Sequence, residues 1–462
     1  MMTATARGLA GYPAARAKAG DSAVVVRWLA VALFASIFLQ RFAIPGSGGI
    51  GANLLVTLTA LAALGLRGVL RVDPLRAVLF LALACWAALS MAANAAAASV
   101  DSVLLMLVLY APFTLSLRPA APLCGDVVAA LLRIFQVMVL VAAVCGMVQY
   151  LAQFVWHGLG LFSFQGVVPD QFLVPNYNTV IPLRYGATIY KSNGFFFLEP
   201  STFSQYLSLA ILFEVLFWGV TPRLAVFGVA LLLTYSGTGP MMLLILLPCL
   251  ILYRRSYALL LGLAVFAALA VATGKLWHMD ALLQRTNEFG QQGTSATARF
   301  VSSAWLIADT MHWTPHDLLF GLGPGTISHY GRTAEFEVAD PTWGKLLFEY
   351  GLGGAIVFWS FFCHAVFARA PSRWVAAALS IGFLIFGGML LDPRLNTLIL
   401  LFCILPKSPG LRRGAAAAGQ DSSSPSPSRT LPAIALRHGG SSSVSARVPG
   451  SVPGSVPGSG AG

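Results

Sequence analysis

The chain has 462 residues, of which 57% are hydrophobic and only 10% are charged, and its mean hydropathy is +0.77. Soluble domains carry roughly 25% charged residues, so this composition excludes an ordinary soluble protein and indicates a membrane protein. The net charge of +12 comes from lysines and arginines scattered singly or in pairs between apolar runs, which argues against nucleic acid as a partner.

The apolar runs predict an all-α polytopic membrane protein with about 12 transmembrane helices. The run from Ala77 to Val100 contains no charge, and a transmembrane helix needs about 20 mostly apolar residues. Residues 1–22 are expected to form a cytoplasmic N-terminus ahead of the first span. The predicted spans are 23–42, 49–66, 77–97, 100–117, 130–155, 199–219, 221–235, 239–253, 256–273, 342–367, 374–391 and 394–406.

Basic residues mark every second connection between these spans. Examples are Arg67 and Arg71 after the second span, and Arg254 and Arg255 after the eighth. By the positive-inside rule, this alternation predicts that both termini are cytoplasmic. A transmembrane domain over 23–406 then carries two large extracytoplasmic loops with short amphipathic helices, at 156–198 and 274–341.

The end of the chain differs in composition from the rest. After Pro406 the residues are mainly Ala, Ser, Pro and Gly, and Val448–Ser459 forms a repeat. Such a segment cannot bury a core, so we predict a disordered cytoplasmic tail over 407–462.

Cysteine and histidine spacing predicts neither a metal site nor a disulfide framework. No pair of cysteines has C-x-x-C spacing, and five of the six lie inside apolar runs. His312 and His316 are four residues apart, but Pro315 disrupts the helix that a zinc site would need. We expect no metal and no cofactor.

A Gly- and Pro-containing turn, Ser236–Pro240, interrupts the uncharged run between Arg223 and Arg254. Each arm is roughly 22 Å long as a helix, so the turn is expected to stop short of the outer surface. Two interpretations remain open, a packing turn or the lining of a wet cavity. In the second, Ser236 and Thr238 are candidate substrate-binding residues.

The outer loops hold most of the unexpected polar residues. Loop 156–198 carries Arg184 and Lys191, and Glu199 stands where the sixth helix begins, just before Pro200. The helix dipole favours an acid there, so Glu199 is either a structural terminal acid or a functional carboxylate.

Residues 298–311 of the second loop have a helical pattern and predict an amphipathic helix at the outer interface. In this helix Arg299 either extends toward the membrane surface or serves the function. The predicted apolar side consists of Val301, Ala304, Trp305 and Ala308, and the polar side of Arg299, Ser302, Ser303 and Asp309, with Leu306 as an exception.

Two further segments follow in the same loop. The glycine-rich stretch Phe320–His329 lacks the lysine of a phosphate-binding loop, but remains a candidate tight turn whose amides approach a ligand. In Asp340–Gly354, Lys345 and Glu349 are spaced to neutralise one another, or to serve a function at the mouth of a span. Glu214 and Arg133 are expected to be satisfied inside the helix bundle.

Four segments, in this order, resemble the O-antigen ligase and polysaccharide polymerase superfamily of bacteria, over roughly residues 130–400. The resemblance is stronger to repeat-unit polymerases of exopolysaccharide clusters than to ligases. Those ligases carry a histidine where this chain has Asp340–Trp343, and often an arginine where it has Thr238. The segments are SNGFFFLEPS, which includes Glu199; LTYSGTG at Leu233–Gly239; the Arg299 helix with LFGLGPG at Leu319–Gly325; and DPTWGKLLFEYGLGG at Asp340–Gly354.

This resemblance implies glycan transfer at the extracytoplasmic face of the bacterial inner membrane, without metal or nucleotide sugar. The donor would be an undecaprenyl-pyrophosphate-linked oligosaccharide, the acceptor a sugar hydroxyl, and the product an exopolysaccharide, capsule or O-antigen-like polymer. Membrane lipids, a chain-length regulator and export proteins are further expected partners. Cations must stabilise the leaving pyrophosphate and a base must take the hydroxyl proton. The candidate cations are Arg299, Arg184, Lys191, Arg285 and Lys345, and the candidate bases are Glu199, His329 and Asp340.

Other functions remain as alternatives. A ligase would move the finished glycan to another acceptor. A flippase or transporter of the same lipid-linked sugars usually shows matching halves with broken helices, which this sequence lacks. A structural scaffold would leave the outer cations unexplained.

Overall fold

The computed structural model describes residues 19–118, 123–155, 162–175, 180–183, 186–255, 257–275, 294–334, 338–385 and 389–405. Within these ranges the protein is predominantly helical, which confirms the predicted all-α class. The strands β1 (Leu70–Val72) and β2 (Leu115–Leu117) form a short antiparallel pair. The predicted tail, 407–462, lies outside the described residues.

A helix occupies each of the twelve stretches predicted to cross the membrane. Three of them, α3, α5 and α15, are long and apolar enough to span a bilayer, which supports a membrane protein. Most of the others are shorter, so the number of spans and their orientation stay predictions. The helices are α1 (Ala19–Phe38), α2 (Ala52–Leu66), α3 (Pro74–Ala93), α4 (Val100–Tyr110), α5 (Leu123–Ala152), α6 (Pro200–Phe217), α7 (Pro222–Leu233), α8 (Thr238–Arg254), α9 (Tyr257–Ala272), α15 (Thr342–Arg369), α16 (Arg373–Ile385) and α17 (Pro393–Cys403).

Helix α6 lies at the centre of the helix packing. Its residues from Phe203 to Leu216 are all buried, and among them are the polar residues Ser204, Gln205, Ser208 and Glu214. It packs against α5, α7, α8 and α16, and α1 packs against α2, α5 and α17. The start of α6, where Glu199 lies, is therefore fixed by several neighbours.

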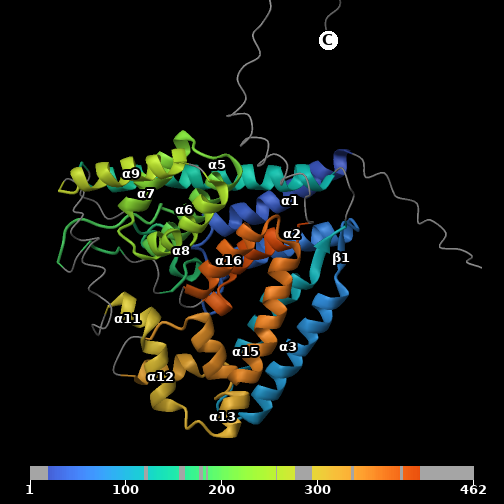
Figure 1. Cartoon of the computed structure of the whole chain (residues 1–462). Coiled ribbons are helices and arrows are strands. Elements are labelled where there is room, and N and C mark those ends of the chain that lie inside the picture. The colour runs from blue at the N-terminus through green and yellow to red at the C-terminus, as the bar shows by residue number, and fades with distance from the viewer. Residues whose placement is uncertain are drawn as a thin grey trace, which may run out of the picture. The chain divides into compact units, whose positions relative to one another are not determined.

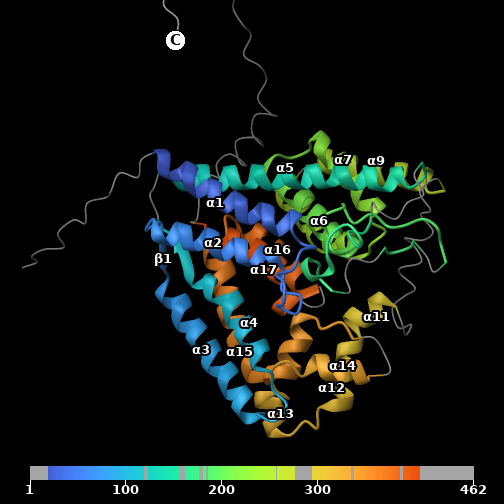
Figure 2. The ribbon, with the colours of Figure 1, turned by 180° about the vertical axis from the view of Figure 1, so that it is seen from behind.

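Helices α3 and α15 lie side by side, with α13 (Pro315–Phe320) at one end of the pair (Figures 1 and 2). Arg76, in the first turn of α3, is fully buried near the other end of α15. Its guanidinium donates to the carbonyl oxygens of Ala365 and Cys403, at 2.6 and 3.3 Å, and to those of Phe113 and Leu115. A buried cation is stable there because helix C-termini present carbonyl oxygens and partial negative charge.

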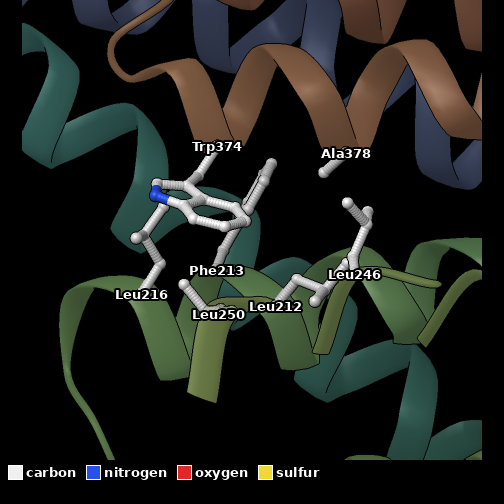
Figure 3. Close-up of a pocket in the computed structure, with 7 residues that line it drawn as sticks. All are labelled: Leu212, Phe213, Leu216, Leu246, Leu250, Trp374 and Ala378. Carbon is white, nitrogen blue, oxygen red and sulfur yellow. The ribbon is translucent and has the colours of Figure 1, made fainter. Parts of the chain in front are cut away.

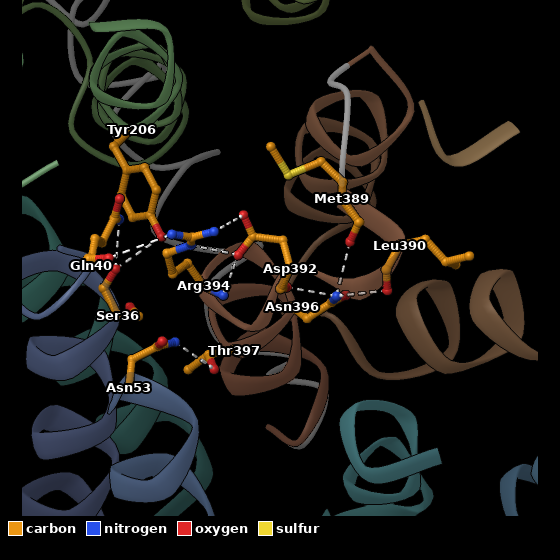
Figure 4. A network of polar contacts seen from close by, with 10 residues as sticks. All are labelled: Ser36, Gln40, Asn53, Tyr206, Met389, Leu390, Asp392, Arg394, Asn396 and Thr397. Atoms are coloured by element: carbon orange, nitrogen blue, oxygen red, sulfur yellow. Dashed lines mark hydrogen bonds and ion pairs between the residues drawn. The ribbon is translucent and has the colours of Figure 1, made fainter. Parts of the chain in front are cut away.

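A second polar network joins α1, α6 and α17 (Figure 4). Asp392 caps the start of α17 and forms a two-pronged ion pair with Arg394, with distances of 2.8 and 2.9 Å. Asn396 donates to the carbonyl oxygens of Met389 and Asp392, and Tyr206 donates to Ser36. These contacts lie within the fold and serve packing.

Two sequence predictions about helices were wrong. Arg133 is exposed on α5, not inside the bundle. The predicted helix over 298–311 is two helices, α11 (Ser295–Phe300) and α12 (Ser302–Thr310), separated at Val301. Part of its predicted polar side faces the protein: Ser302 and Ser303 are buried and donate to backbone carbonyl oxygens, and Leu306 is buried beside them. Asp309, from the same predicted side, is exposed.

Candidate functional site

An ion pair connects the two predicted outer loops at the start of α6. Arg299 Nη2 of α11 lies 3.2 Å from Glu199 Oε2, and Ser201 Oγ donates to the same oxygen at 2.7 Å. Arg299 also donates to Ser201 Oγ at 3.4 Å. The side chains of Arg299 and Glu199 keep 19% and 28% of their surface exposed, so a ligand can reach both.

The turn between α7 and α8 packs directly beneath this pair. Thr238 Oγ1 lies 2.8 Å from Ser236 Oγ and 2.9 Å from Ser204 Oγ. Ser204 Oγ donates to the carbonyl oxygen of Ser201 at 2.7 Å, and Thr238 approaches the same oxygen at 3.4 Å. Gly239 allows the approach, because a Cβ there would come within 2.5 Å of the Ser204 carbonyl oxygen. The predicted turn is present, although α8 already begins at Thr238. Thr238 contacts α6, and Ser236 contacts Thr238.

A second group of charges lies at the start of α15. Lys345 Nζ contacts Asp340 Oδ2 at 3.0 Å and Glu349 Oε1 at 3.1 Å. The lysine side chain is 6% exposed and that of Glu349 is fully buried, whereas Asp340 keeps 34%. The sequence-based pairing of Lys345 with Glu349 is confirmed, and Asp340 joins it as an additional partner.

The two charged groups lie on adjoining pieces of backbone. Ala339 donates its amide to the carbonyl oxygen of Ala298 at 3.1 Å, and Ser303 Oγ donates to the carbonyl oxygen of Ala339 at 2.9 Å. Arg299 directly follows Ala298, and Asp340 directly follows Ala339. The two charged residues therefore lie next to the two ends of this backbone hydrogen bond. The structure thus brings Glu199, Arg299 and Asp340 into one region.

Helix α15 is interrupted at Gly351, where φ is +67°. The freed carbonyl oxygens of Phe348 and Glu349 accept from the amides of Leu322 and Gly323, at 2.8 and 3.1 Å. Gly321 and Gly351 meet backbone to backbone, and a Cβ on either would lie within 2.7 Å of main-chain atoms of the other segment. Amides of the glycine-rich stretch therefore bind the chain's own carbonyl groups.

The remaining candidate residues lie away from the two charged groups or outside the described residues. His329 is exposed on α14 (Ile327–Thr333), where its ring contacts Tyr330. Lys191 is buried, and its amide donates to the carbonyl oxygen of Ile181. Arg184 and Arg285 lie outside the described residues.

Arg41, which follows α1, was missed by the sequence analysis because it falls inside the predicted span 23–42. Its guanidinium donates to the carbonyl oxygens of Phe195 and Phe162, at 3.1 and 2.6 Å, and lies 4.7 Å from the centre of the Phe164 ring. Arg41 thus anchors the segment that leads to Glu199; an arginine at the end of a span was the available signal.

A pocket between α6, α8 and α16 does not belong to this region (Figure 3). Its lining is apolar apart from the indole nitrogen of Trp374, so it offers no charged group that would bind a phosphate. The lining residues are Leu212, Phe213, Leu216, Leu246, Leu250, Trp374 and Ala378.

Comparison with known proteins identifies the family of the chain. No curated protein matches the sequence significantly. Residues 28–408 match the WcaD colanic acid polymerase family, and this range contains every residue of both charged groups. The resemblance to exopolysaccharide repeat-unit polymerases is thereby confirmed, and the chain belongs to the WcaD colanic acid polymerase family.

Proposed function

We propose that this protein joins undecaprenyl-pyrophosphate-linked oligosaccharide repeat units into an exopolysaccharide at the extracytoplasmic face of the inner membrane. The family supports the polymerisation of repeat units. The observation that carries the proposed site is the Arg299–Glu199 pair, because it places an accessible cation beside an accessible carboxylate on α11 and α6. These are the two groups that the reaction requires.

In the proposed step, the bond between the first sugar carbon of the donor and its pyrophosphate oxygen breaks. A hydroxyl oxygen of the acceptor sugar forms the new glycosidic bond to that carbon. The electron pair of the broken bond leaves with the pyrophosphate, whose charge Arg299 stabilises through paired hydrogen bonds. Glu199 accepts the hydroxyl proton.

The geometry supports an exchange of partners at Arg299. With Glu199 bound, the arginine is neutralised and the carboxylate is occupied. A pyrophosphate carries more negative charge than one carboxylate, so it competes for the guanidinium. Donor binding then frees Glu199 to act as a base, while Ser201 remains beside both side chains.

The other candidates take supporting roles in this proposal. Thr238 holds the Ser201 backbone from below, since its hydroxyl already contacts Ser204 and Ser201 on α6. Ser236 supports Thr238, because their two hydroxyls contact each other. Lys345 already contacts two carboxylates, so we assign it the role of orienting Asp340 rather than that of binding the substrate. Asp340 and His329 remain secondary candidates for the base. Lys191, Arg184 and Arg285 remain secondary candidates for binding the donor.

The test is a polymerisation assay with purified protein and labelled lipid-linked repeat units extracted from cells that lack the gene. We expect a ladder of products in the presence of EDTA, and no ladder from Arg299→Ala at unchanged protein abundance. Arg332→Ala is the matched control, because Arg332 is exposed on α14 and contacts only its own helix in the described structure. A normal ladder from Arg299→Ala would remove this residue from the site.

The alternatives predict different cellular intermediates. Cells without a polymerase accumulate single lipid-linked repeat units that face outward. Units trapped on the cytoplasmic side would indicate a flippase. Full-length polymer that remains on the lipid would indicate a ligase.

A further inference from the structure

Glu349 is a fully buried carboxylate for which the proposed reaction has no direct use. It lies on the short stretch of α15 just before the break at Gly351. A buried charge is costly unless its partners compensate it, so its presence there requires an explanation.

Glu349 engages neighbours through both its backbone and its side chain. The backbone carbonyl oxygen accepts from the Gly323 amide at 3.1 Å and from Ser90 Oγ of α3 at 3.0 Å. The side-chain oxygen Oε1 accepts from Lys345 Nζ at 3.1 Å and from the Ile327 amide at 3.3 Å. One residue therefore connects α3, the glycine-rich stretch, α14 and the first turn of α15.

The side-chain contacts of Glu349 lead to the candidate site. Lys345 Nζ contacts both Glu349 Oε1 and Asp340 Oδ2. Asp340 directly follows Ala339, whose amide donates to Ala298, the residue before Arg299. Without Glu349, Lys345 would be buried with one carboxylate, and its ammonium would be free to move with the partly exposed Asp340. The backbone contacts at Gly351 do not depend on this charge.

We propose that Glu349 is a positioning residue, which holds Asp340 beside Arg299 through Lys345 and fixes the start of α14 through Ile327. This inference rests on the proposed function. Asp340 is thereby kept at the edge of the site, with its carboxylate aimed by a buried lysine.

The test is a double-mutant cycle on the polymerisation assay. Glu349→Gln keeps an acceptor for the Ile327 amide but removes the charge that orients Lys345. We expect kcat to fall on the order of tenfold to a hundredfold, with the donor KM changed less than about twofold. In an Asp340→Asn background, Glu349→Gln should cause no further loss, because both changes interrupt the same connection.

Glu214→Gln is the matched control. Glu214 is also buried on a helix, at 1% exposure, and the Oε2 atoms of Glu214 and Glu349 both lack a hydrogen bond among the described residues. Its contacts, Thr221 and Arg223, lie at the other end of α6 from Glu199. We expect its kcat to equal that of the wild type.

A second variant separates positioning from folding. Lys345→Met with Glu349→Leu removes both buried charges together, which proteins often tolerate. We expect folded protein with a reduced kcat. Wild-type kcat in either variant, additive losses with Asp340→Asn, or loss of folded protein in both variants would overturn the proposal. Absence of a ladder from the wild type would instead contradict the proposed function.

Discussion

Two arginines of this protein are held in opposite ways. Arg76 is fully buried and donates to backbone carbonyl oxygens from η1 (Ala111–Thr114), β2, α15 and α17. Arg299 is 19% exposed and is held by the side chains of Glu199 and Ser201, at 3.2 and 3.4 Å. Carbonyl groups fixed in helix ends cannot leave, whereas a carboxylate can be displaced by a stronger anion. The first arrangement therefore suits architecture and the second suits ligand exchange.

The largest expected effect is on Arg76, where the comparison predicts loss of the fold. Arg76→Met removes a donor from several buried carbonyl oxygens, at a cost of roughly 1–3 kcal/mol for each one left without another donor. We expect little folded protein in detergent extracts and a lower thermal unfolding temperature for what remains. Arg71→Met, at an exposed position on β1, should behave as wild type. A stable, active Arg76→Met variant would show that these contacts with carbonyl oxygens contribute little to the stability of the fold.

An intermediate effect is expected at Glu199, where the exchange of partners can be tested directly. Glu199→Gln weakens the hold on Arg299, so the donor KM should fall severalfold. The base is lost at the same time, so kcat should fall on the order of 10²-fold or more. A decrease in both kcat and donor KM is the signature to measure in steady-state assays. Asp309→Asn, an exposed carboxylate on α12, is the control; an unchanged or raised KM in Glu199→Gln would contradict the exchange.

The smallest expected effect is at the turn beneath the pair. Thr238→Val removes a hydroxyl that contacts Ser204 and Ser236 but conserves the volume of the side chain. We expect a loss of about 1 kcal/mol in the free energy of unfolding and a fewfold decrease in kcat. Thr59→Val is the control, because Thr59 is exposed on α2 and bonds only its own helix in the described structure. A loss of all activity at normal stability would instead favour direct substrate contact by Thr238.

The sequence by itself determined the membrane class, the helical stretches and the family. Each of these depends on local composition and chain order: long apolar runs, the glycine- and proline-containing turn at Ser236–Pro240, and motifs in a fixed sequence. The i, i+4 contact of Lys345 with Glu349 was predictable for the same reason, since one helix sets its geometry.

Contacts between distant segments were decided only by the tertiary structure. Glu199 and Arg299 are 100 residues apart, and no local pattern indicates which acid pairs with which cation. The burial of Ser303 on α12 was mispredicted because its acceptor, the carbonyl oxygen of Ala339, lies on a distant segment. Glu349 was recognised only as a partner of Lys345, because the carbonyl and amide groups that it connects come from α3, α14 and the glycine-rich stretch. Which side chains pair with one another depends on which segments pack together. Apolar runs indicate that a segment can cross the membrane, but they do not specify its neighbours.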